Sequence, residues 1–436
     1  MNDKGLLKEF GKYASLNVSG MIGLSCYILA DTYFVAKGLG SNGLTALNIA
    51  IPVYSFMNGT GLMLAMGGAT KFSIAKGNNK KEAEHWFTDT LITASFFMAV
   101  LVLAGIFFSG AITELLGADA EVFDMTKIYL KTLLICSPFF MLNNIVICFV
   151  RNDGNPKLAT TGMIVGSFSN VLLDWVFIFV TKWGMFGAVF ATCLSPVISL
   201  SILSMHFIRK KNTFRIIRTK PAFSIAKSIL SLGFPSLIME FSSGIVIIIF
   251  NMLMFKLEGN IGIAAYGVIA NISIVAIAMY TGISQGIQPI ISRSYGNSDL
   301  KSCRKVLSYA LITEVIISAV VYLIIFCFSD GITAIFNSEN NLQLQAIAVK
   351  GLKLYFPAII FAGFNIIISV FFTSCEKALP AHIISLLRGL FVIVPMAFIM
   401  SAVWGITGVW LSYPVTELIV SVIGAFIYFL QLKKSH

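Results

Sequence analysis

Long apolar stretches alternate with short polar segments along the whole chain. Each stretch approaches the ~20 residues that an α-helix needs to cross the hydrocarbon core of a bilayer. The pattern predicts an all-α polytopic membrane protein with twelve transmembrane helices. The predicted spans are 13–36, 44–70, 87–110, 127–150, 158–181, 185–208, 228–255, 261–290, 306–329, 349–373, 379–402 and 406–431.

The composition supports this fold class. Of the 436 residues, 57% are hydrophobic and only 12% are charged, whereas a soluble domain carries about 25% charged residues. The net charge of +11 would suit a nucleic-acid partner, but the Lys and Arg residues lie between the spans. With the N-terminus in the cytoplasm, 23 of them fall on cytoplasmic segments and 7 on outer loops or the outer ends of spans, as the positive-inside rule requires. We expect both termini in the cytoplasm, contact with membrane lipids and no nucleic-acid partner.

The two halves of the sequence resemble each other at a shift of about 220 residues. Each half has six predicted spans, an even number, so both halves run through the membrane in the same direction. Two parallel six-helix bundles around a central cleft are typical of a transporter that opens alternately to the two sides. The matching segments are LTALNIAIP from Leu44 with IAAYGVIAN from Ile263, AKGNNKKEA from Ala75 with SYGNSDLKS from Ser294, SPFF from Ser137 with FPAI from Phe356, and WGMFGAVF from Trp183 with WGITGVWL from Trp404.

The repeat predicts a division into three parts. These are an N-terminal six-helix bundle (1–208), a basic cytoplasmic linker (209–227) and a C-terminal six-helix bundle (228–436). The linker contains the longest basic run, RKKNTFRIIRTK, and we expect a solvated segment held at anionic lipid headgroups. The seven Cys residues show no metal or disulfide spacing, so we expect them to be small packing residues.

Few ionisable residues lie inside the predicted spans, and they are the candidates for function. An ionised carboxylate at bilayer depth costs about 2.5–3.5 kcal/mol, so such residues usually face a cavity and act on ions or substrates. Asn170 precedes Asp174 by four residues in GSFSNVLLDWVFIFV, so the amide and the carboxylate share one helix face. The candidates are Asp31, Asp174, Glu240, Glu314, Arg388 and Glu417.

These candidates differ in their expected depth. Asp31 stands about four residues from the outer end of its span, where solvation by water is the alternative to function. Glu240 is too deep in its span for easy snorkelling. Arg388 and Glu417 lie in neighbouring spans, and we expect an ion pair that holds or gates the bundle. Glu314 is expected at the interface or paired with a neighbour.

The chain has no motif for direct use of ATP or for hydrolysis. No GxxxxGK[ST], HExxH or GxSxG sequence stands in or beside a span, so we expect a transporter rather than an enzyme, with no catalytic residue and no cofactor. A carboxylate in a low-dielectric bundle can take a proton near neutral pH, and together with Asn and Thr oxygens it can hold a small cation. Binding of H⁺ or Na⁺ would change the charge in the bundle and bias which side is open.

Several motifs together resemble the MATE family, the multidrug and toxic compound extrusion transporters, and in particular its MepA-like bacterial branch. The resemblance covers essentially the whole chain. The motifs are ADTYFVAKGLGSNGLTALNIAIPV, GGATKFSIAKGNNKKEAE, RNDGNPKLA, SNVLLDWVFIF and KWGMFGAVFATCLS in the first half, and GFPSLIMEFSSGIVIIIFN, SLLRGLFVIVP and GVWLSYPVTELI in the second.

The resemblance implies multidrug efflux of hydrophobic organic cations across the bacterial cytoplasmic membrane by exchange for H⁺ or Na⁺, with no obligatory protein partner. It implies that Glu240 attracts the cationic substrate. Trp175 stands where many relatives have Pro, which predicts a straighter fifth span. The coupling-ion site that the resemblance implies comprises Asp31, Asn170, Asp174 and Thr192, with Na⁺, if it is the ion, held at Asp31, Asn170 and Asp174 and no other metal.

Two other functions remain open. A lipid or lipid-linked sugar flippase has a similar two-bundle architecture, but it is expected to line its cleft with several Arg and Lys residues. Here Arg388 is the only Arg or Lys deep inside a span, and Glu417 can neutralise it. An accessory structural or sensor protein without transport is the third possibility. The absence of a sizeable soluble domain and the set of buried carboxylates argue against it.

Overall fold

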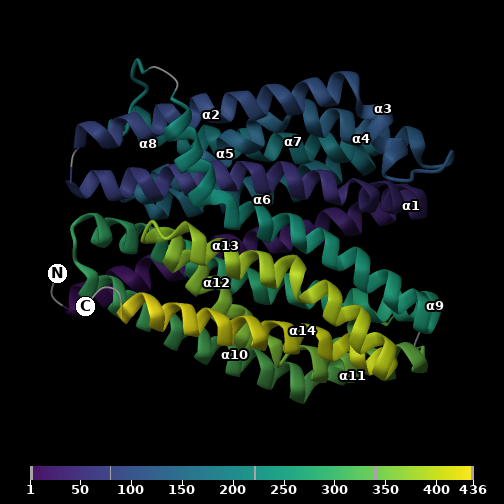
Figure 1. The fold of residues 1–436 in the computed structure, drawn as a ribbon. Helices are drawn as coiled ribbons and strands as arrows, with labels where there is room; N and C mark the ends of the chain where they lie inside the picture. The colour runs from purple at the N-terminus through teal and green to yellow at the C-terminus, as the bar shows by residue number, and fades with distance from the viewer. Residues whose placement is uncertain (1–2, 79, 220–221, 338–340, 434–436) are drawn as a thin grey trace. The chain divides into compact units, whose positions relative to one another are not determined.

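A computed structural model describes residues 3–78, 80–219, 222–337 and 341–433. Within these ranges the chain is almost entirely helical and contains no strand, which confirms the all-α fold class. Figure 1 labels the helices in chain order. They are α1 (Asp3–Asn78), α2 (Lys80–Phe107), α3 (Ser109–Leu115), α4 (Phe123–Ile135), α5 (Ser137–Asn152), α6 (Pro156–Trp175), η1 (Val176–Val180), α7 (Gly184–Leu203), α8 (Met205–Ile208), α9 (Phe223–Gly296), α10 (Leu300–Phe336), α11 (Leu342–Tyr355), α12 (Ala358–Ser374), α13 (Ala378–Leu386), η2 (Leu387–Phe391) and α14 (Ile393–Lys433).

Three helices run from one membrane span into the next through a glycine. α1 turns at Gly40 (φ 71°), α9 at Gly259 (φ 60°) and α14 at Gly405 (φ 56°). These angles lie in the left-handed region, which glycine adopts at far lower cost than other residues, so one span ends and the next begins without a longer loop. Gly40 and Gly259 are equivalent in the sequence repeat, as are Gly405 and Gly184 (φ 63°) at the start of α7.

The fourth and tenth spans are each built from two bent helices. α4 meets α5 at 48°, and α11 meets α12 at 47°. Both breaks fall in segments that the repeat aligns, SPFF from Ser137 and FPAI from Phe356, where a proline removes a backbone donor. With each bent pair counted as one span, and with α1, α9 and Ala378–Lys433 divided at their glycines, the described residues form the twelve predicted spans.

The fifth and eleventh spans each contain a π-helical segment, η1 and η2. The backbone N–H of Thr181 donates to the carbonyl of Val176 at 2.9 Å, and that of Val392 donates to Leu387 at 2.9 Å. Such wide turns occur frequently at functional sites. Trp175 ends α6 directly before η1, so the fifth span departs from a regular α-helix there although it has no proline in its interior.

Large apolar side chains cover the outward faces of several helices. They recur at helical spacing on α2 and α10, and each is more than a third exposed in the isolated chain. Such faces are a liability in water but carry no cost in hydrocarbon, so the chain is embedded in a membrane. Examples are Phe96, Val100, Leu103 and Phe107 on α2 and Ile312, Ile316 and Leu323 on α10.

Inside the protein, small residues let helices approach closely. A Cβ added at Gly166 of α6 would lie 3.1 Å from the Cβ of Ser199 and 3.2 Å from the carbonyl oxygen of Ser195, both on α7. Ser195 Oγ donates to the carbonyl of Gly166 at 2.8 Å. Because lipid supplies no hydrophobic drive between membrane helices, such contacts and hydrogen bonds hold α6 against α7.

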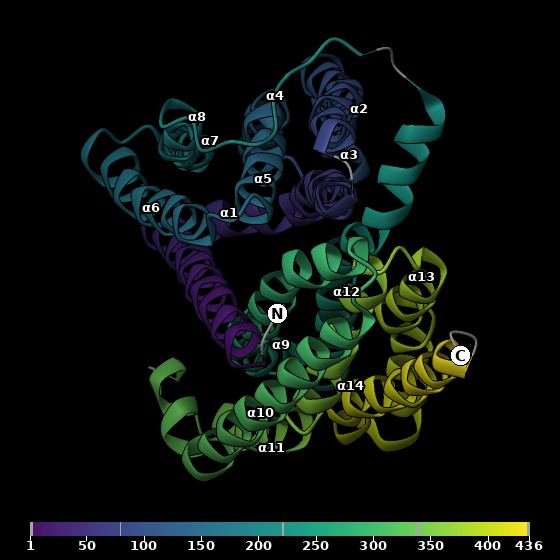
Figure 2. The same cartoon turned by 90° about the vertical axis from the view of Figure 1, so that its left-hand side faces the viewer.

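Contacts divide the chain into two compact units. The N-terminal unit comprises Ser15–Phe241 and Pro289–Leu300, and the C-terminal unit comprises Met1–Ala14, Ser242–Gln288 and Lys301–His436. Figure 2 views many helices of both units close to end-on. The unit boundaries fall inside α1 and α9 and at the start of α10, so the division at the linker into 1–208, 209–227 and 228–436 stays a prediction.

Candidate functional site

Two carboxyl groups meet inside the N-terminal unit. Asp31 lies on α1 and Asp174 near the end of α6, and their carboxyl groups lie close enough to interact directly. Asp31 is 9% exposed and Asp174 is fully buried, so the alternative that water solvates Asp31 is wrong. If both groups were ionised, their charges would repel strongly at low dielectric, and Oδ1 of Asp174 would receive no donor from the described residues. The pair therefore needs a proton or a cation.

Asn170 and Thr192 complete the polar cluster around Asp174. In one orientation of the Asn170 amide, Nδ2 donates to Asp174 Oδ2 at 3.0 Å and the amide oxygen accepts from the backbone N–H of Thr192 at 3.2 Å. This orientation satisfies both amide atoms, whereas the opposite one leaves only a 3.5 Å contact with Thr192 Oγ1. The structure thus brings together all four residues of the predicted coupling-ion site. Their role in coupling stays a prediction.

Close helix packing positions this cluster. A Cβ added at Gly38 of α1 would lie 2.2 Å from Cγ2 of Ile178 in η1, so the absence of a side chain lets span one lie against the π-helical segment. Asp31 stands two turns before Gly38 on the same helix and is carried towards α6 by this approach. Gly166 precedes Asn170 by one turn of α6 and allows α7 to pack closely there. This approach brings Thr192 of α7 next to Asn170.

Sequence reasoning missed the tyrosines beside the carboxyl pair. Tyr27, Tyr54 and Tyr129 all lie within electrostatic range of Asp31. The hydroxyls of Tyr27 and Tyr54 are 3.2 Å apart, and all three side chains are largely shielded from solvent. Tyr27 precedes Asp31 by four residues, so the one-turn spacing was a readable signal. Tyr54 and Tyr129 reach the site only through tertiary packing.

Glu240 lies in a separate chain of polar side chains within the same unit. Asn58 Nδ2 donates to Glu240 Oε2 at 3.2 Å, and Asn144 Nδ2 donates to Asn58 Oδ1 at 3.0 Å. Glu240 is half-buried, and its Cβ lies 3.0 Å from the position of a Cβ added at Gly59. The carboxylate on α9 is therefore packed against the second span of α1. Its predicted role in substrate binding stays a prediction.

Arg388 and Glu417 form a buried ion pair in the C-terminal unit. Arg388 Nη2 lies 2.9 Å from Glu417 Oε1, and Arg388 Nε donates to the same oxygen at 2.9 Å. Asn365 of α12 donates to Glu417 Oε2 at 2.7 Å and to its backbone carbonyl at 2.9 Å, and Ser421 donates to Asn365 Oδ1 at 3.2 Å. The pair joins η2 to α14. Whether it holds or gates the bundle stays a prediction.

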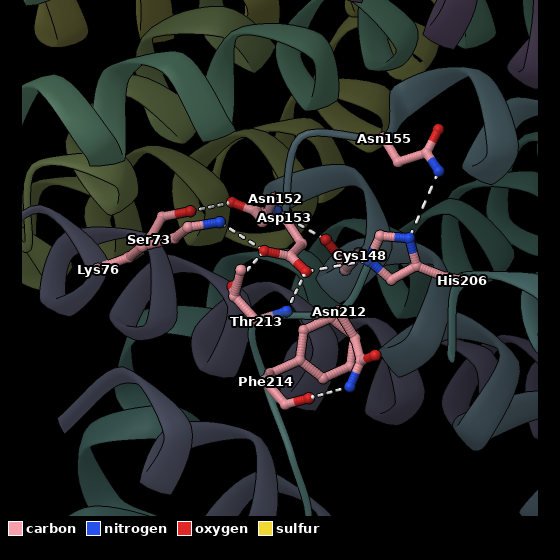
Figure 3. A network of polar contacts seen from close by, with 10 residues as sticks. All are labelled: Ser73, Lys76, Cys148, Asn152, Asp153, Asn155, His206, Asn212, Thr213 and Phe214. Carbon is pink, nitrogen blue, oxygen red and sulfur yellow. Dashed lines mark hydrogen bonds and ion pairs between the residues drawn. The ribbon is translucent and has the colours of Figure 1, made fainter. Parts of the chain in front are cut away.

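A second polar cluster lies at the linker end of the N-terminal unit (Figure 3). Oδ2 of Asp153 contacts Nε2 of His206 at 2.9 Å and accepts from the backbone N–H of Thr213 at 2.7 Å, while Oδ1 is paired with Lys76 and the Thr213 hydroxyl. Burial opposes ionisation of Asp153, but the hydrogen bonds from His206, Lys76 and Thr213 outweigh it and hold the pKa of Asp153 below its ordinary value. The cluster ties together the ends of three spans and the linker.

The middle of the linker is anchored in the N-terminal unit. Phe214 is fully buried among rings from α1, α2, α5 and α8, and Thr88 of α2 accepts from the backbone N–H of Ile217 at 3.0 Å. The expectation of a solvated linker is therefore wrong at Phe214, because an aromatic side chain gains more from burial than from the headgroup region. The rings within contact of Phe214 are Phe72, Phe87, Phe149, His206 and Phe207.

Known proteins resemble the chain over nearly its full length. A family model described as MatE matches residues 18–176 and 235–399. The multidrug export protein MepA of Staphylococcus saprophyticus is 26% identical over 407 residues, which cover 93% of this chain and 89% of that protein. The protein of the same name from Staphylococcus haemolyticus is 23% identical over 406 residues, covering 92% and 89%.

Solved structures share the fold. An outward-facing multidrug resistance MATE family transporter of the MOP superfamily has a TM-score of 0.90 at 22% identity, covering 100% of this chain and 98% of that chain. A MOP superfamily transporter from Pyrococcus furiosus, described as having a binding pocket of reverse polarity, has a TM-score of 0.90 at 21% identity, covering 98% and 96%. At this identity the likeness shows the fold alone.

Proposed function

The chain belongs to the MATE family of membrane transporters, and from that membership we propose that it exports hydrophobic organic cations from the cell in exchange for H⁺ or Na⁺. The multidrug export proteins that it resembles support a broad range of substrates. The observation that carries the exchange is the contact between Asp31 and Asp174 inside the N-terminal unit. A buried pair of carboxyls can hold one H⁺ or Na⁺ or release it, and the two states differ by one unit of charge.

Asp31, Asn170, Asp174 and Thr192 form the coupling-ion site in this proposal. A proton held between the two carboxyls removes their repulsion. It also supplies a hydrogen-bond donor to Asp174 Oδ1, which otherwise receives none from the described residues. Na⁺ would find hard oxygen ligands in Asp31 and Asp174, and also in the amide of Asn170 once that amide turns its oxygen towards the carboxyls, opposite to the orientation that bonds Asp174. In either case the loss of the ion leaves excess negative charge in the bundle, which favours a different arrangement of spans one, five and six.

Glu240 attracts the cationic substrate in this proposal. Glu240 is half-buried and carries a negative charge, and the hydrogen bond it accepts comes from the neutral amide of Asn58. A hydrophobic cation that binds near Glu240 and a coupling ion that binds at Asp174 would both neutralise negative charge in the N-terminal unit, so the binding of one reduces the attraction for the other. Their binding is therefore antagonistic, which is the thermodynamic condition for exchange.

We place the protein in the bacterial cytoplasmic membrane with both termini in the cytoplasm, because the distribution of Lys and Arg follows the positive-inside rule. No cofactor and no obligatory protein partner enter this proposal. The Arg388–Glu417 pair is neutral as a whole, so it holds η2 against α14 without adding charge to the C-terminal unit.

The test is ethidium efflux from cells and from everted vesicles, with the Na⁺ and H⁺ gradients collapsed separately. Efflux that stops when one gradient is lost establishes exchange and identifies the ion. Asp174→Asn is expected to abolish this coupled efflux while the protein still folds, because the amide has the shape of the carboxyl without its charge. Glu121→Gln is the matched control, since Glu121 is an exposed carboxylate outside the cluster.

The proposal fails if efflux is indifferent to both gradients or is absent. Lipid substrates would then be measured next, because the flippase alternative uses the same two-bundle architecture. Wild-type efflux by Asp174→Asn would instead remove Asp174 from coupling while leaving the transport activity in place.

A further inference from the structure

Glu314 is a buried carboxyl that the proposed exchange does not use. It lies on α10 in the C-terminal unit and is 1% exposed, and of the two expected arrangements the structure shows the one in which it is paired with a neighbour. Ser318, one turn further along α10, donates to Glu314 Oε1 at 2.7 Å. The hydroxyl of Tyr280 on α9 lies 2.8 Å from Ser318 Oγ, so three oxygen-bearing groups form a continuous hydrogen-bonded chain.

Among the described residues, the groups that face Glu314 are neutral. They are Ser318 on its own helix, Tyr280 on α9, which is titratable but uncharged at neutral pH, and Gly363 on α12. An ionised carboxylate at this depth would lack both water and a counter-charge. Neutral donors reduce that cost but do not remove it, so the carboxyl is stable here with its proton attached.

Gly363 closes the site from the side of α12. A Cβ added at Gly363 would lie 2.5 Å from both Cγ and Oε1 of Glu314, so this helix rests directly on the carboxyl group. α12 begins five residues earlier, at the 47° break that divides the tenth span. A change in that bend would move the backbone that covers Glu314, and water would then reach the carboxyl.

The opposite face of α12 contacts the Arg388–Glu417 pair. Asn365 follows Gly363 by two residues, which places the two on nearly opposite sides of the helix. Asn365 donates to both the side chain and the backbone of Glu417. α12 therefore lies between the carboxyl of Glu314 and the ion pair, and a shift of this helix affects both.

We propose that Glu314, Ser318 and Tyr280 form a proton-binding site of the C-terminal unit, separate from the carboxyl pair of the N-terminal unit. The ligand is a proton rather than a metal ion, because one carboxylate and two hydroxyls supply too few oxygens to replace the hydration shell of a cation. The site holds its proton while α12 covers it and exchanges the proton when α12 moves. A role for this site in the transport cycle rests on the exchange proposed above, whereas the binding of a proton at Glu314 is independent of that proposal.

Difference infrared spectroscopy of the purified full-length protein tests this site. Spectra recorded between about pH 5 and pH 9 distinguish the carbonyl band of a protonated carboxylic acid from the bands of a carboxylate. We expect a protonated band at neutral pH that Glu314→Gln removes and that Glu121→Gln leaves in place. Ser318→Ala should shift the frequency of the same band, because it removes the donor to Oε1 without touching the carboxyl itself.

The titration of protons supplies a second measurement. Between the same pH limits we expect Glu314→Gln to release about one proton per chain fewer than the wild type. An unchanged band and an unchanged proton count in Glu314→Gln would overturn the proposal. So would loss of the band on addition of Na⁺ at constant pH, since the site would then hold a cation.

The background Asp31→Asn/Asp174→Asn separates this inference from the proposed function. Loss of dye export in that background concerns only the N-terminal site, and the Glu314 band should persist there. Conversely, a protein that exports dye with coupling but shows no band assigned to Glu314 would retain the proposed function and lose the second proton site.

Discussion

Removal of Arg388 should destabilise the protein more than removal of Arg388 together with Glu417. In Arg388→Ala the carboxylate of Glu417, which is 1% exposed in the wild-type protein, loses its counter-charge. In the double variant Arg388→Ala/Glu417→Ala no charge remains. The comparison therefore separates the cost of a stranded charge from the cost of lost packing.

The size of the effect follows from the geometry of the pair. Truncation of one partner of a buried ion pair costs about 3–5 kcal/mol. Asn365 still donates to Glu417 at 2.7 Å after the truncation, so we expect a loss near the lower end of that range. The double variant should be less destabilised than the sum of the two single variants by roughly 0.5–3 kcal/mol, which is the usual range for coupling between contacting residues.

The single variant Glu417→Ala provides a further comparison. It strands the guanidinium of Arg388, whose side chain is 13% exposed, whereas Arg388→Ala strands a carboxylate that is 1% exposed. A partly exposed, flexible guanidinium can move towards water more easily than a sealed carboxylate. We therefore expect Glu417→Ala to be the less damaging of the two single changes.

Unfolding of the purified protein in mixed detergent micelles measures these differences. Tryptophan fluorescence reports the transition, since the buried Trp410 lies on the same helix as Glu417. Glu417→Gln is the matched control, because it keeps the volume and the contact with Asn365 while it removes the charge. A double variant no more stable than Arg388→Ala would refute the reasoning, and a stable double variant that no longer exports would assign the pair to gating.

Three further changes probe the other clusters. Glu240→Gln should weaken the binding of cationic dyes more than that of neutral dyes in a fluorescence titration, and equal losses for both would remove Glu240 from the substrate site. Phe214→Ala should lower the free energy of unfolding by about 3–5 kcal/mol because of the cavity it leaves. Ile216→Ala, at an exposed linker position, is the control. An equal effect of the two changes would show that Phe214 does not anchor the linker in the N-terminal unit. The pKa of Asp153 is lowered in the folded state. Its ionisation therefore stabilises the protein at pH values above the ordinary pKa of about 3.9, and this contribution disappears as the pH falls through the pKa of the folded state. Asp153→Asn should therefore be less stable than the wild type at neutral pH and approach it below about pH 4, and a difference that does not change with pH would contradict the assignment.

The sequence by itself determined the spans, the repeat and one half of the candidate site. Each membrane helix must satisfy its own backbone hydrogen bonds, so apolar length alone predicts a span. Gly40 and Gly259 stand at equivalent places in the repeat, and the structure turns at both. Asn170 and Asp174 were readable as neighbours because one helical turn separates them.

Only the tertiary structure decided which carboxyls meet. Asp31 and Asp174 lie on different helices, and their contact depends on Gly38 and Gly166, whose missing side chains allow α1 and α7 to approach α6 and η1. Arg388 and Glu417 were predicted as partners because opposite charges in adjacent spans have few alternatives. The third member of their cluster, Asn365, is one polar residue among many and carries no such signal in the sequence.

Glu314 and Phe214 show the physical reason for this limit. In a soluble protein a buried face is apolar and an exposed face is polar, so periodicity reveals which residues are inside. In a membrane protein both the lipid-facing and the protein-facing sides of a helix are apolar, and the periodic signal disappears. The burial of Glu314 against Gly363, and of Phe214 among the rings of the N-terminal unit, therefore follows from helix packing and from no pattern in the sequence.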